Sequence, residues 1–203
     1  GEISLLAGVG TTGTTVGGGI IEKNFLGKGI NLETNLEVSE ETIKGKFVYS
    51  KPNFAYTDNT LFTSVKATTS DFLTDYGYKV KETGFSLGTT YEQYENLFFS
   101  PEISLVIEDL TTNSTASSQR KKQEGTYEDF YFNYGLNYDL RDSSYRPTSG
   151  SNTTFYQELP VISGNNELSN TFIYTQYKNL NQSSNMIGKA SLYFKAVNAL
   201  DDS

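Results

Sequence analysis

Cysteine, histidine and tryptophan are all absent from these 203 residues, which include a single methionine and four prolines. Without cysteine or histidine, the chain offers no thiol nucleophile, no histidine-dependent catalytic triad and none of the usual zinc ligand sets. No run of 18 apolar residues occurs either, so the sequence predicts no transmembrane helix. We therefore expect neither an enzyme nor a bound cofactor or metal.

Basic side chains are scarce as well. Sixteen lysines and arginines stand against 24 aspartates and glutamates, which gives a formal net charge of −8 and a pI near 4.6. Surfaces that bind nucleic acid need clustered positive charge, so no nucleic-acid partner is expected. The N-terminus has no basic segment followed by an apolar core, which predicts a mature or truncated start.

What the sequence does contain is a period-two alternation of apolar and polar side chains. It is clearest in residues 130–139, FYFNYGLNYD, where large apolar side chains take every second position. Successive side chains on a strand point to opposite faces, so this segment has one apolar and one polar face. Only 36% of the residues are hydrophobic although 14% are aromatic, which suits a sheet with lipid on one side and a polar lumen on the other.

The same alternation predicts about eleven strands separated by turn residues. The predicted strands are Glu2–Gly10, Thr14–Lys23, Ile30–Val38, Thr42–Tyr49, Leu61–Thr69, Val80–Tyr91, Leu97–Glu108, Tyr127–Leu140, Thr153–Leu159, Thr171–Lys178 and Met186–Lys195. One face of the third strand carries four polar side chains that do not belong in a dry core: Asn31, Glu33, Asn35 and Glu37. We therefore predict one all-β domain over residues 1–203, an antiparallel transmembrane β-barrel built as an up-and-down meander and incomplete at its C-terminal end.

Aromatic side chains often stand near the predicted strand ends, where they would form girdles at headgroup depth or ordinary cross-strand pairs. These residues are Tyr49, Phe54, Tyr56, Tyr91, Tyr94, Phe98, Phe99 and Tyr138. Some connections are tight and others long, as in barrels with short periplasmic turns and longer outer loops. The longest, residues 111–126, is expected to be a solvated, mobile tip.

Three turn segments carry more information than composition does. In residues 24–29, NFLGKG, the glycines suit the positive-φ conformations of a tight turn, and Phe25 and Leu26 are expected to bury against the barrel end. In residues 141–150, the opposite charges of Arg141 and Asp142 beside a Pro-Thr-Ser-Gly turn are expected to pin the connection through a charge-assisted hydrogen bond. The motif residues, all expected to be structural, are Asn24, Phe25, Leu26, Gly27, Gly29, Pro52, Phe54, Asp139, Arg141, Asp142, Pro147, Thr148 and Gly150.

In their order and spacing, these motifs resemble turns in the barrel of the BamA-like outer-membrane protein assembly factors. That family extends to two-partner secretion, TamA-like translocation and mitochondrial sorting. Its barrels carry an N-[FW]-L-G-x-G turn, a P-x-[FY] turn after the fourth strand, and a D-x-R-D … P-T-x-G connection from the eighth strand to the ninth. The resemblance covers nearly the whole chain, and it implies a barrel in contact with the lipid bilayer of a Gram-negative outer membrane.

The resemblance also implies a function. In the family, the first strand pairs weakly with the last, and an incoming client strand adds to the exposed edge. Carried over to this chain, the edge consists of Glu2, Ile3, Ser4, Leu5, Leu6, Ala7 and Gly8. The implied partners are unfolded outer-membrane proteins and accessory assembly lipoproteins, and the work uses no nucleotide.

The chain departs from the family pattern at both ends. Family members carry soluble polypeptide-transport-associated domains before the barrel, and a V-R-G-[FY] loop later in it, and neither is found here. We therefore expect the N-terminal portion of a larger insertase barrel. The alternative is a barrel of roughly eight to twelve strands that closes on itself as a pore, receptor or anchor. A hydrolase would lack a histidine base, and a soluble sandwich would need a continuous aliphatic core.

Overall fold

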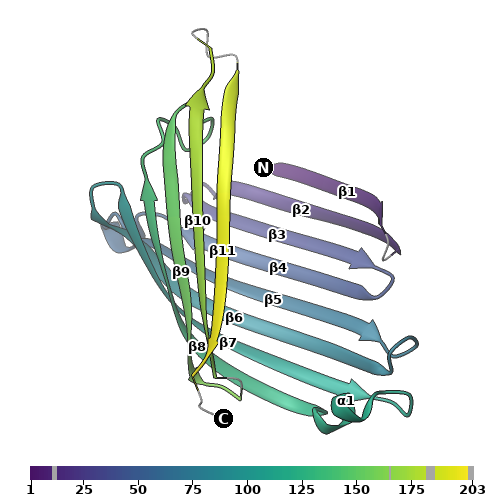
Figure 1. Cartoon of the computed structure of the whole chain (residues 1–203). Coiled ribbons are helices and arrows are strands. Elements are labelled where there is room, and N and C mark those ends of the chain that lie inside the picture. Colours follow the sequence, from purple (N-terminus) through teal and green to yellow (C-terminus); the bar gives the residue numbers. More distant parts are fainter. Residues whose placement is uncertain (11–12, 165, 182–185, 201–203) are drawn as a thin grey trace.

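The computed structural model describes residues 1–10, 13–164, 166–181 and 186–200, which form one antiparallel sheet of eleven strands (Figure 1). The strands are β1 (Glu2–Gly10), β2 (Gly13–Phe25), β3 (Ile30–Ser39), β4 (Thr42–Lys51), β5 (Thr60–Phe72), β6 (Tyr78–Tyr94), β7 (Leu97–Thr112), β8 (Gly125–Asp139), β9 (Gly150–Ile162), β10 (Glu167–Asn179) and β11 (Ile187–Ala199). A 3-10 turn, η1 (Phe54–Tyr56), follows β4, and a short helix, α1 (Ser118–Lys122), precedes β8. Because the spatial order of the strands is their sequence order, the predicted up-and-down meander is confirmed. The predicted turn at residues 11–13 lies mostly outside the described residues.

The sheet curls but does not close. β1 pairs with β2 alone and β11 with β10 alone, so each has one edge without a partner strand in the described part of the chain. Figure 1 shows β9, β10 and β11 running steeply across the direction of β1–β5, as expected for a twisted sheet wrapped around a hollow. These strands therefore form a partial barrel, and the small closed barrel considered as the alternative is not what they build.

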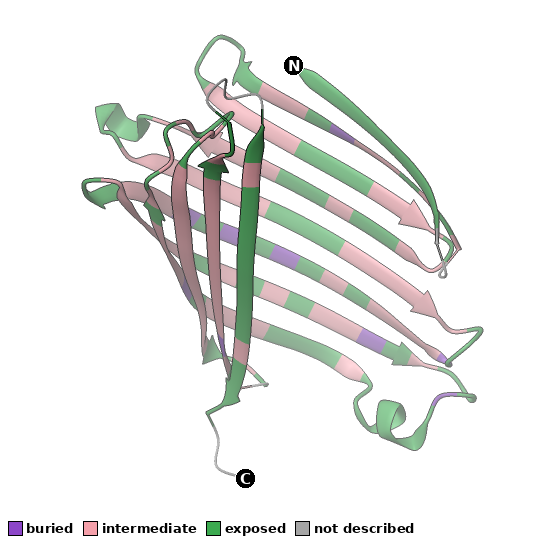
Figure 2. Ribbon diagram, turned by 45° about the horizontal axis from the view of Figure 1, so that its top comes forward, coloured by how far each residue is buried: buried purple, intermediate pink, exposed green. Residues whose placement is uncertain are grey.

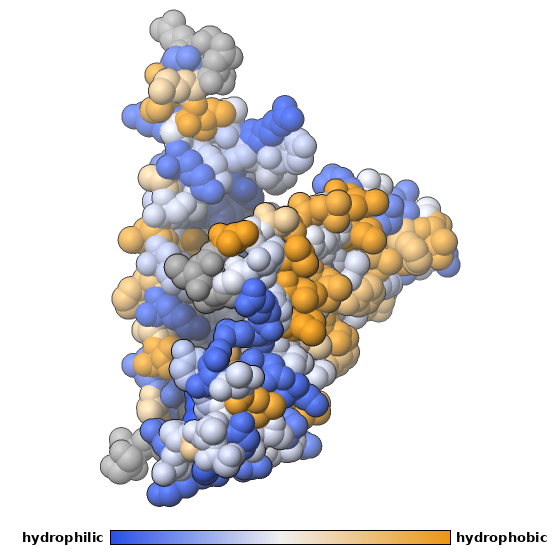
Figure 3. Space-filling view, turned by 90° about the vertical axis from the view of Figure 1, so that its right-hand side faces the viewer, coloured by the Kyte–Doolittle hydropathy of each residue, from blue (hydrophilic) through white to orange (hydrophobic). Residues whose placement is uncertain are grey.

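The distribution of side chains over the two faces is the reverse of that in a water-soluble sheet. Along β6, Phe85 and Leu87 are exposed, while Gly84, Ser86 and Gly88, which alternate with them, are buried. The buried polar side chains of the described residues are Ser86, Asn133 and Ser169. Figure 2 shows exposed and intermediate bands along the strands with few buried positions, and Figure 3 shows hydrophobic side chains gathered over one side of the molecule. An apolar outer face around small and polar inner side chains suits a sheet that faces lipid.

The strand register keeps each kind of side chain on one face. Directly paired residues of antiparallel strands point to the same side. One such row crosses β4 to β8 on the outer face and consists of Phe47, Val65, Phe85, Leu105 and Phe130. The next row, starting from Lys46 and Lys66, lies on the inner face. A slip of one residue would exchange the two faces, so burial in lipid fixes the register.

Some of the predicted girdle residues do meet across strands. The rings of Tyr91 and Phe99 lie 5.7 Å apart in an edge-to-face arrangement, and Phe99 is 6.0 Å from Tyr134. These contacts lie on the outer face and fit either a girdle or cross-strand pairing. Phe98 alternates with Phe99 and therefore faces inward, so it does not belong to a girdle.

The long connection after β7 contacts a neighbouring turn. The Asn113 backbone N–H donates to the Gly77 carbonyl at 2.8 Å, and its side-chain amide donates to the Leu73 carbonyl at 2.9 Å. The Arg120 guanidinium lies 4.6 Å from the centre of the Tyr78 ring. The loop therefore packs against the β5–β6 turn, a contact that the sequence did not predict. Most of its residues are exposed, as expected of a solvated tip, and its mobility stays a prediction.

Candidate functional site: the first strand, the inner face and the turn motifs

All seven residues of the predicted pairing edge lie in β1. The strand is held along one side by β2, from Glu2 opposite Ile21 to Gly10 opposite Gly13. Its apolar outer side chains are strongly exposed, Ile3 by 77%, Leu5 by 88% and Val9 by 86%. Its other side presents main-chain N–H and C=O groups to no partner in the described residues. In lipid, each unpaired group costs several kcal/mol, so this edge has a strong tendency to accept another strand.

β1 and β2 make few side-chain contacts with each other. Ser4, Leu5 and Leu6 stand opposite three consecutive glycines, residues 17–19, which offer no side chain to pack against. Cross-strand side-chain pairs contribute about 0.2–1 kcal/mol each to a sheet, and none forms here. The pairing at the centre of β1 thus rests on the backbone ladder and one long hydrogen bond, from the Ser4 hydroxyl to the Gly19 carbonyl at 3.5 Å.

Of these three glycines, Gly19 lies closest to neighbouring side chains, so any side chain there would displace Asn35. A Cβ atom there would lie 2.2 Å from Asn35 Oδ1 and 3.0 Å from Ser4 Oγ. Asn35 is one of the four predicted lumen-facing residues of β3, and its Nδ2 donates to Glu33 Oε1 at 2.8 Å. The inner face of β1–β3 is therefore polar and crowded at this point, as the alternation predicted.

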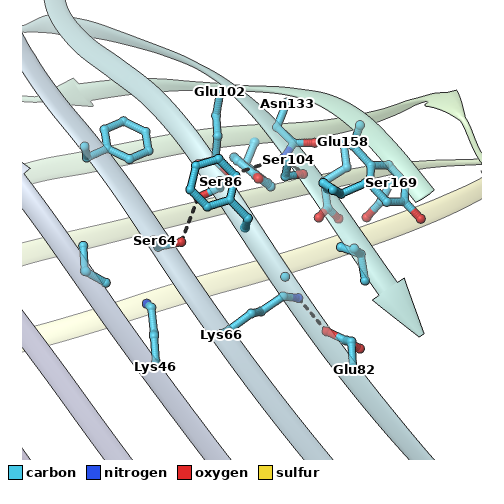
Figure 4. A pocket seen from close by; sticks show the side chains of 18 of the residues that line it. Lys46, Ser64, Lys66, Glu82, Ser86, Glu102, Ser104, Asn133, Glu158 and Ser169 are labelled. Atoms are coloured by element: carbon cyan, nitrogen blue, oxygen red, sulfur yellow. Dashed lines mark hydrogen bonds and ion pairs between the residues drawn. The ribbon is translucent and has the colours of Figure 1, made fainter. Parts of the chain in front are cut away.

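Further along the sheet, charged and hydroxyl side chains cover the inner face of β4 to β10 (Figure 4). Lys66 Nζ forms an ion pair with Glu82 at 2.7 Å, and the hydroxyls of Ser64 and Ser86 lie 2.7 Å apart. Of this face, only the β3 residues were predicted from the sequence. The alternation along β7 and β8 also assigns Glu102 and Asn133 to the inner face. Which of these side chains lie next to each other, however, depends on the register of several strands.

The three turn motifs lie together at one rim of the sheet. Each follows an even-numbered strand, and a meander places all such connections at the same end. The predicted division into short turns at one end and long loops at the other is not observed. Residues 52–59 and 140–149 are long connections at the motif rim, and residues 113–124 form one at the opposite rim.

The first motif closes as predicted but does not bury its apolar residues. Gly27 and Gly29 have φ angles of 69° and 66°, and the Gly29 N–H donates to Asn24 Oδ1 at 2.7 Å. Phe25 is 40% exposed and Leu26 73% exposed. The expectation that they bury against the barrel end was wrong, because the turn extends beyond the last rung of the ladder.

The second motif stops β4 and turns the chain. Pro52 follows the last residue of β4, and Asn53 adopts a left-handed φ of 52° before η1. The Phe54 N–H then donates to the Asn59 carbonyl at 2.9 Å. The motif thus acts through backbone conformation, as expected of a structural turn.

In the third motif, charge-assisted bonds do form, but Arg141 pairs with Asp139, which lies just before the predicted segment 141–150. The guanidinium donates from Nε to Oδ1 at 2.7 Å and from Nη2 to Oδ2 at 2.6 Å, the bidentate geometry that Arg favours. Asp142 instead accepts from the backbone N–H groups of Thr148 and Ser149 at 2.9 and 3.2 Å, and from the Thr148 hydroxyl. These bonds lower the pKa of Asp142 from 3.8 to about 2.

No group of three or more acidic side chains that could hold a metal ion occurs among the described residues. In the same residues, no helix is long and apolar enough to cross a membrane.

Comparisons with known proteins agree with this geometry. Residues 24–200 match the Omp85 superfamily domain. Among solved structures, the chain is similar to "The crystal structure of BamA from Haemophilus ducreyi lacking POTRA domains 1-3", with a TM-score of 0.69 and 22% sequence identity. The match covers 96% of this chain and 41% of that one, so this chain spans less than half the length of that protein. No curated protein matches the sequence.

Proposed function

Because the chain belongs to the Omp85 superfamily, we propose that its strands form part of an insertase barrel that assembles other outer-membrane proteins. Members of this superfamily are non-enzymatic assembly factors or transporters, and its bacterial members lie in the Gram-negative outer membrane. The resemblance to a BamA-like barrel, predicted from three turn motifs, is thereby confirmed for the fold, as is the expectation of a non-enzymatic protein. Localisation in the outer membrane of a Gram-negative bacterium is part of the proposal for this chain.

The observation that supports the insertase role is the free edge of β1. Its main-chain groups face no partner in the described residues, and its centre is opposed by residues 17–19, all glycine. An unfolded client would add a strand to this edge by main-chain hydrogen bonding, which needs no particular side chain. The energy would come from the folding of the client itself, without a nucleotide.

Partners follow from the same proposal. The apolar outer face contacts the lipid bilayer, and the clients are unfolded outer-membrane proteins. Accessory assembly lipoproteins are a further proposed partner, for which no residue of this chain is assigned a docking role.

The proposal is tested by disulfide crosslinking between this protein and a client during assembly. Since the chain has no cysteine, Ser4→Cys reports only on β1, and Ser64→Cys on β5 provides a matched control whose strand is paired on both sides. The client carries a cysteine in one of its terminal strands. We expect it to form disulfide adducts with the Ser4→Cys variant and none with the Ser64→Cys variant. Client assembly without any adduct at β1, or with equal adducts at β5, would contradict the proposal.

A further inference from the structure

Four residues of the inner face lie side by side on four consecutive strands. Glu102 on β7 pairs with Asn133 on β8, which pairs with Glu158 on β9, which in turn pairs with Ser169 on β10. Figure 4 shows these side chains following one another along the wall of the hollow. Side chains of directly paired residues lie about 4.5–5.5 Å apart at Cβ, so each can share a ligand with the next.

The Asn133 amide can satisfy only one of the two carboxylates beside it. Asn133 Nδ2 donates to Ser104 Oγ at 3.0 Å and to Glu102 Oε1 at 3.4 Å, both on β7. Because the amide is planar, Oδ1 is turned away from β7 and toward Glu158. Rotating the amide by 180° would serve Glu158 but would place Oδ1 against Glu102. In either orientation, an amide oxygen faces a carboxylate.

The residues on either side of Glu158 each contribute one buried oxygen atom without a hydrogen-bond partner. Asn133 is 2% exposed and Ser169 is 8% exposed, and Asn133 Oδ1 and Ser169 Oγ have no hydrogen-bond partner among the described residues. No ion pair or hydrogen bond reaches the Glu158 carboxylate within the same residues. Buried polar atoms are rarely left unpartnered, and a carboxylate between two such oxygens attracts a positive charge.

We propose that Glu158, Asn133 Oδ1 and Ser169 Oγ bind a hard divalent cation such as Ca²⁺ on the inner wall, with water completing its coordination. Carboxylate, amide and hydroxyl oxygens are the ligands that Ca²⁺ prefers. Glu102 holds the Asn133 amide in the orientation that presents Oδ1 to the ion. The site would tie β8, β9 and β10 together, and it does not depend on strand pairing at β1.

The lysines of the hollow bear on the strength of this site. Lys66 is paired with Glu82, whereas Lys46 and Lys195 line the same hollow with no carboxylate within 4.0 Å among the described residues. Their charges oppose a cation, so we expect weak binding, with a Kd of about 10⁻⁴–10⁻³ M. Lys195, on β11, lines the same hollow as Glu158 and is therefore the lysine to test as an intramolecular alternative to the ion.

The test is a Tb³⁺ titration of the full chain folded in detergent, with excitation of tyrosine. Tyr131 and Tyr156 line the hollow, so a bound Tb³⁺ ion should emit and Ca²⁺ should displace it. Glu158→Gln should weaken binding at least tenfold. Glu37→Gln, which removes a carboxylate from the inner face of β3, should leave it unchanged.

A second variant separates binding from folding. Ser169→Ala removes a hydroxyl without a partner, so it should leave the unfolding midpoint unchanged in the absence of cation and yet weaken Ca²⁺ binding several-fold. Tb³⁺ emission that Ca²⁺ does not displace, or that persists unchanged in Glu158→Gln, would overturn the proposal. A third result would also overturn it: Lys195→Met lowers the unfolding midpoint as much as Glu158→Gln does, and Ca²⁺ changes the midpoint of neither variant. Glu158 would then pair with Lys195 and not with an ion.

Discussion

Gly150 has a φ of +94°, and a Cβ atom there would lie 2.1 Å from the Leu140 carbonyl oxygen and 2.8 Å from Arg141 Cα. Both obstacles are backbone, so the β8–β9 connection must shift to accept any side chain. We predict that Gly150→Ala lowers the free energy of unfolding by about 1–3 kcal/mol, measured by urea titration in detergent.

Gly135 on β8 is the matched control for this change. Its φ is not positive, and an added Cβ would find its nearest neighbour, Ser100 Cβ, at 3.7 Å. Gly135→Ala should leave stability unchanged or raise it by up to about 1 kcal/mol. Equal effects of the two substitutions would show that the motif glycine is not conformationally required.

The Asp142 carboxylate gives the same connection a dependence on pH. Its pKa in the folded chain, about 2, lies below the ordinary 3.8, so its stabilising effect is fully present above pH 3.8 and is lost as the pH falls toward 2. We predict that the Thr148 and Ser149 amides stay protected from hydrogen exchange at neutral pH and lose protection between about pH 4 and pH 2. In Asp142→Asn, amide protection should no longer change between pH 4 and pH 2. If the variant lost protection over this range as the original chain does, the assignment to Asp142 would be refuted.

At the scale of elements, the β1–β2 hairpin contains a matched pair of tests. Gly18 lies on the outer face, where an added Cβ would contact Leu5 Cδ2 at 3.4 Å, whereas Gly19 lies on the inner face, 2.2 Å from Asn35 Oδ1. We predict that Gly18→Ala increases amide protection in β1 by roughly 0.5 kcal/mol through reduced chain entropy and a new contact. Gly19→Ala should decrease it, because Asn35 must give up its place beside Glu33.

Hydrogen exchange of β1 amides measures both changes in the same segment. Effects of the same sign at the two positions would contradict the assignment of Gly18 and Gly19 to opposite faces. If Gly18→Ala lowered the amide protection of β1, the lack of side-chain contacts at Gly18 would not be what weakens the pairing of β1 with β2.

The strands themselves were predictable because alternation is local. All eleven appear in order, including β10, whose sequence alternates poorly but which β9 and β11 complete on either side. What the sequence could not reveal depends on neighbours far along the chain. The loop containing Arg120 packs on a turn some 40 residues earlier, as the Asn113 bond to Leu73 shows, and the row from Glu102 to Ser169 exists only through the register of four strands.

The pairing edge was identified through a resemblance, and its function remains a prediction. Its position is at the margin of the sheet: β1 has no partner strand on one side among the described residues and little side-chain support from β2 on the other. The apolar turn residues Phe25 and Leu26 show the opposite case, since their composition suggested burial although they are 40% and 73% exposed.

For the whole molecule, the central feature is a curved sheet with an apolar outside and a polar inside. Its outer rows of Phe, Val, Leu and Ile would be unfavourable in water, and its inner ion pairs and hydroxyls would be unfavourable in lipid. Membrane insertion satisfies both faces at once. Within the described residues, β1 and β11 each have one side without a partner strand, and unpaired backbone groups in lipid require partners.

The most direct test of this account is a single-cysteine scan of β5, which lies in the middle of the sheet and adds its cysteines to a chain that has none. A bimane label would be placed in turn at Val65, Lys66, Ala67 and Thr68 on the protein reconstituted in bilayers. We predict quenching by brominated lipid at Val65 and Ala67 and by aqueous iodide at Lys66 and Thr68. Quenching without this alternation, or with the two faces exchanged, would contradict the account.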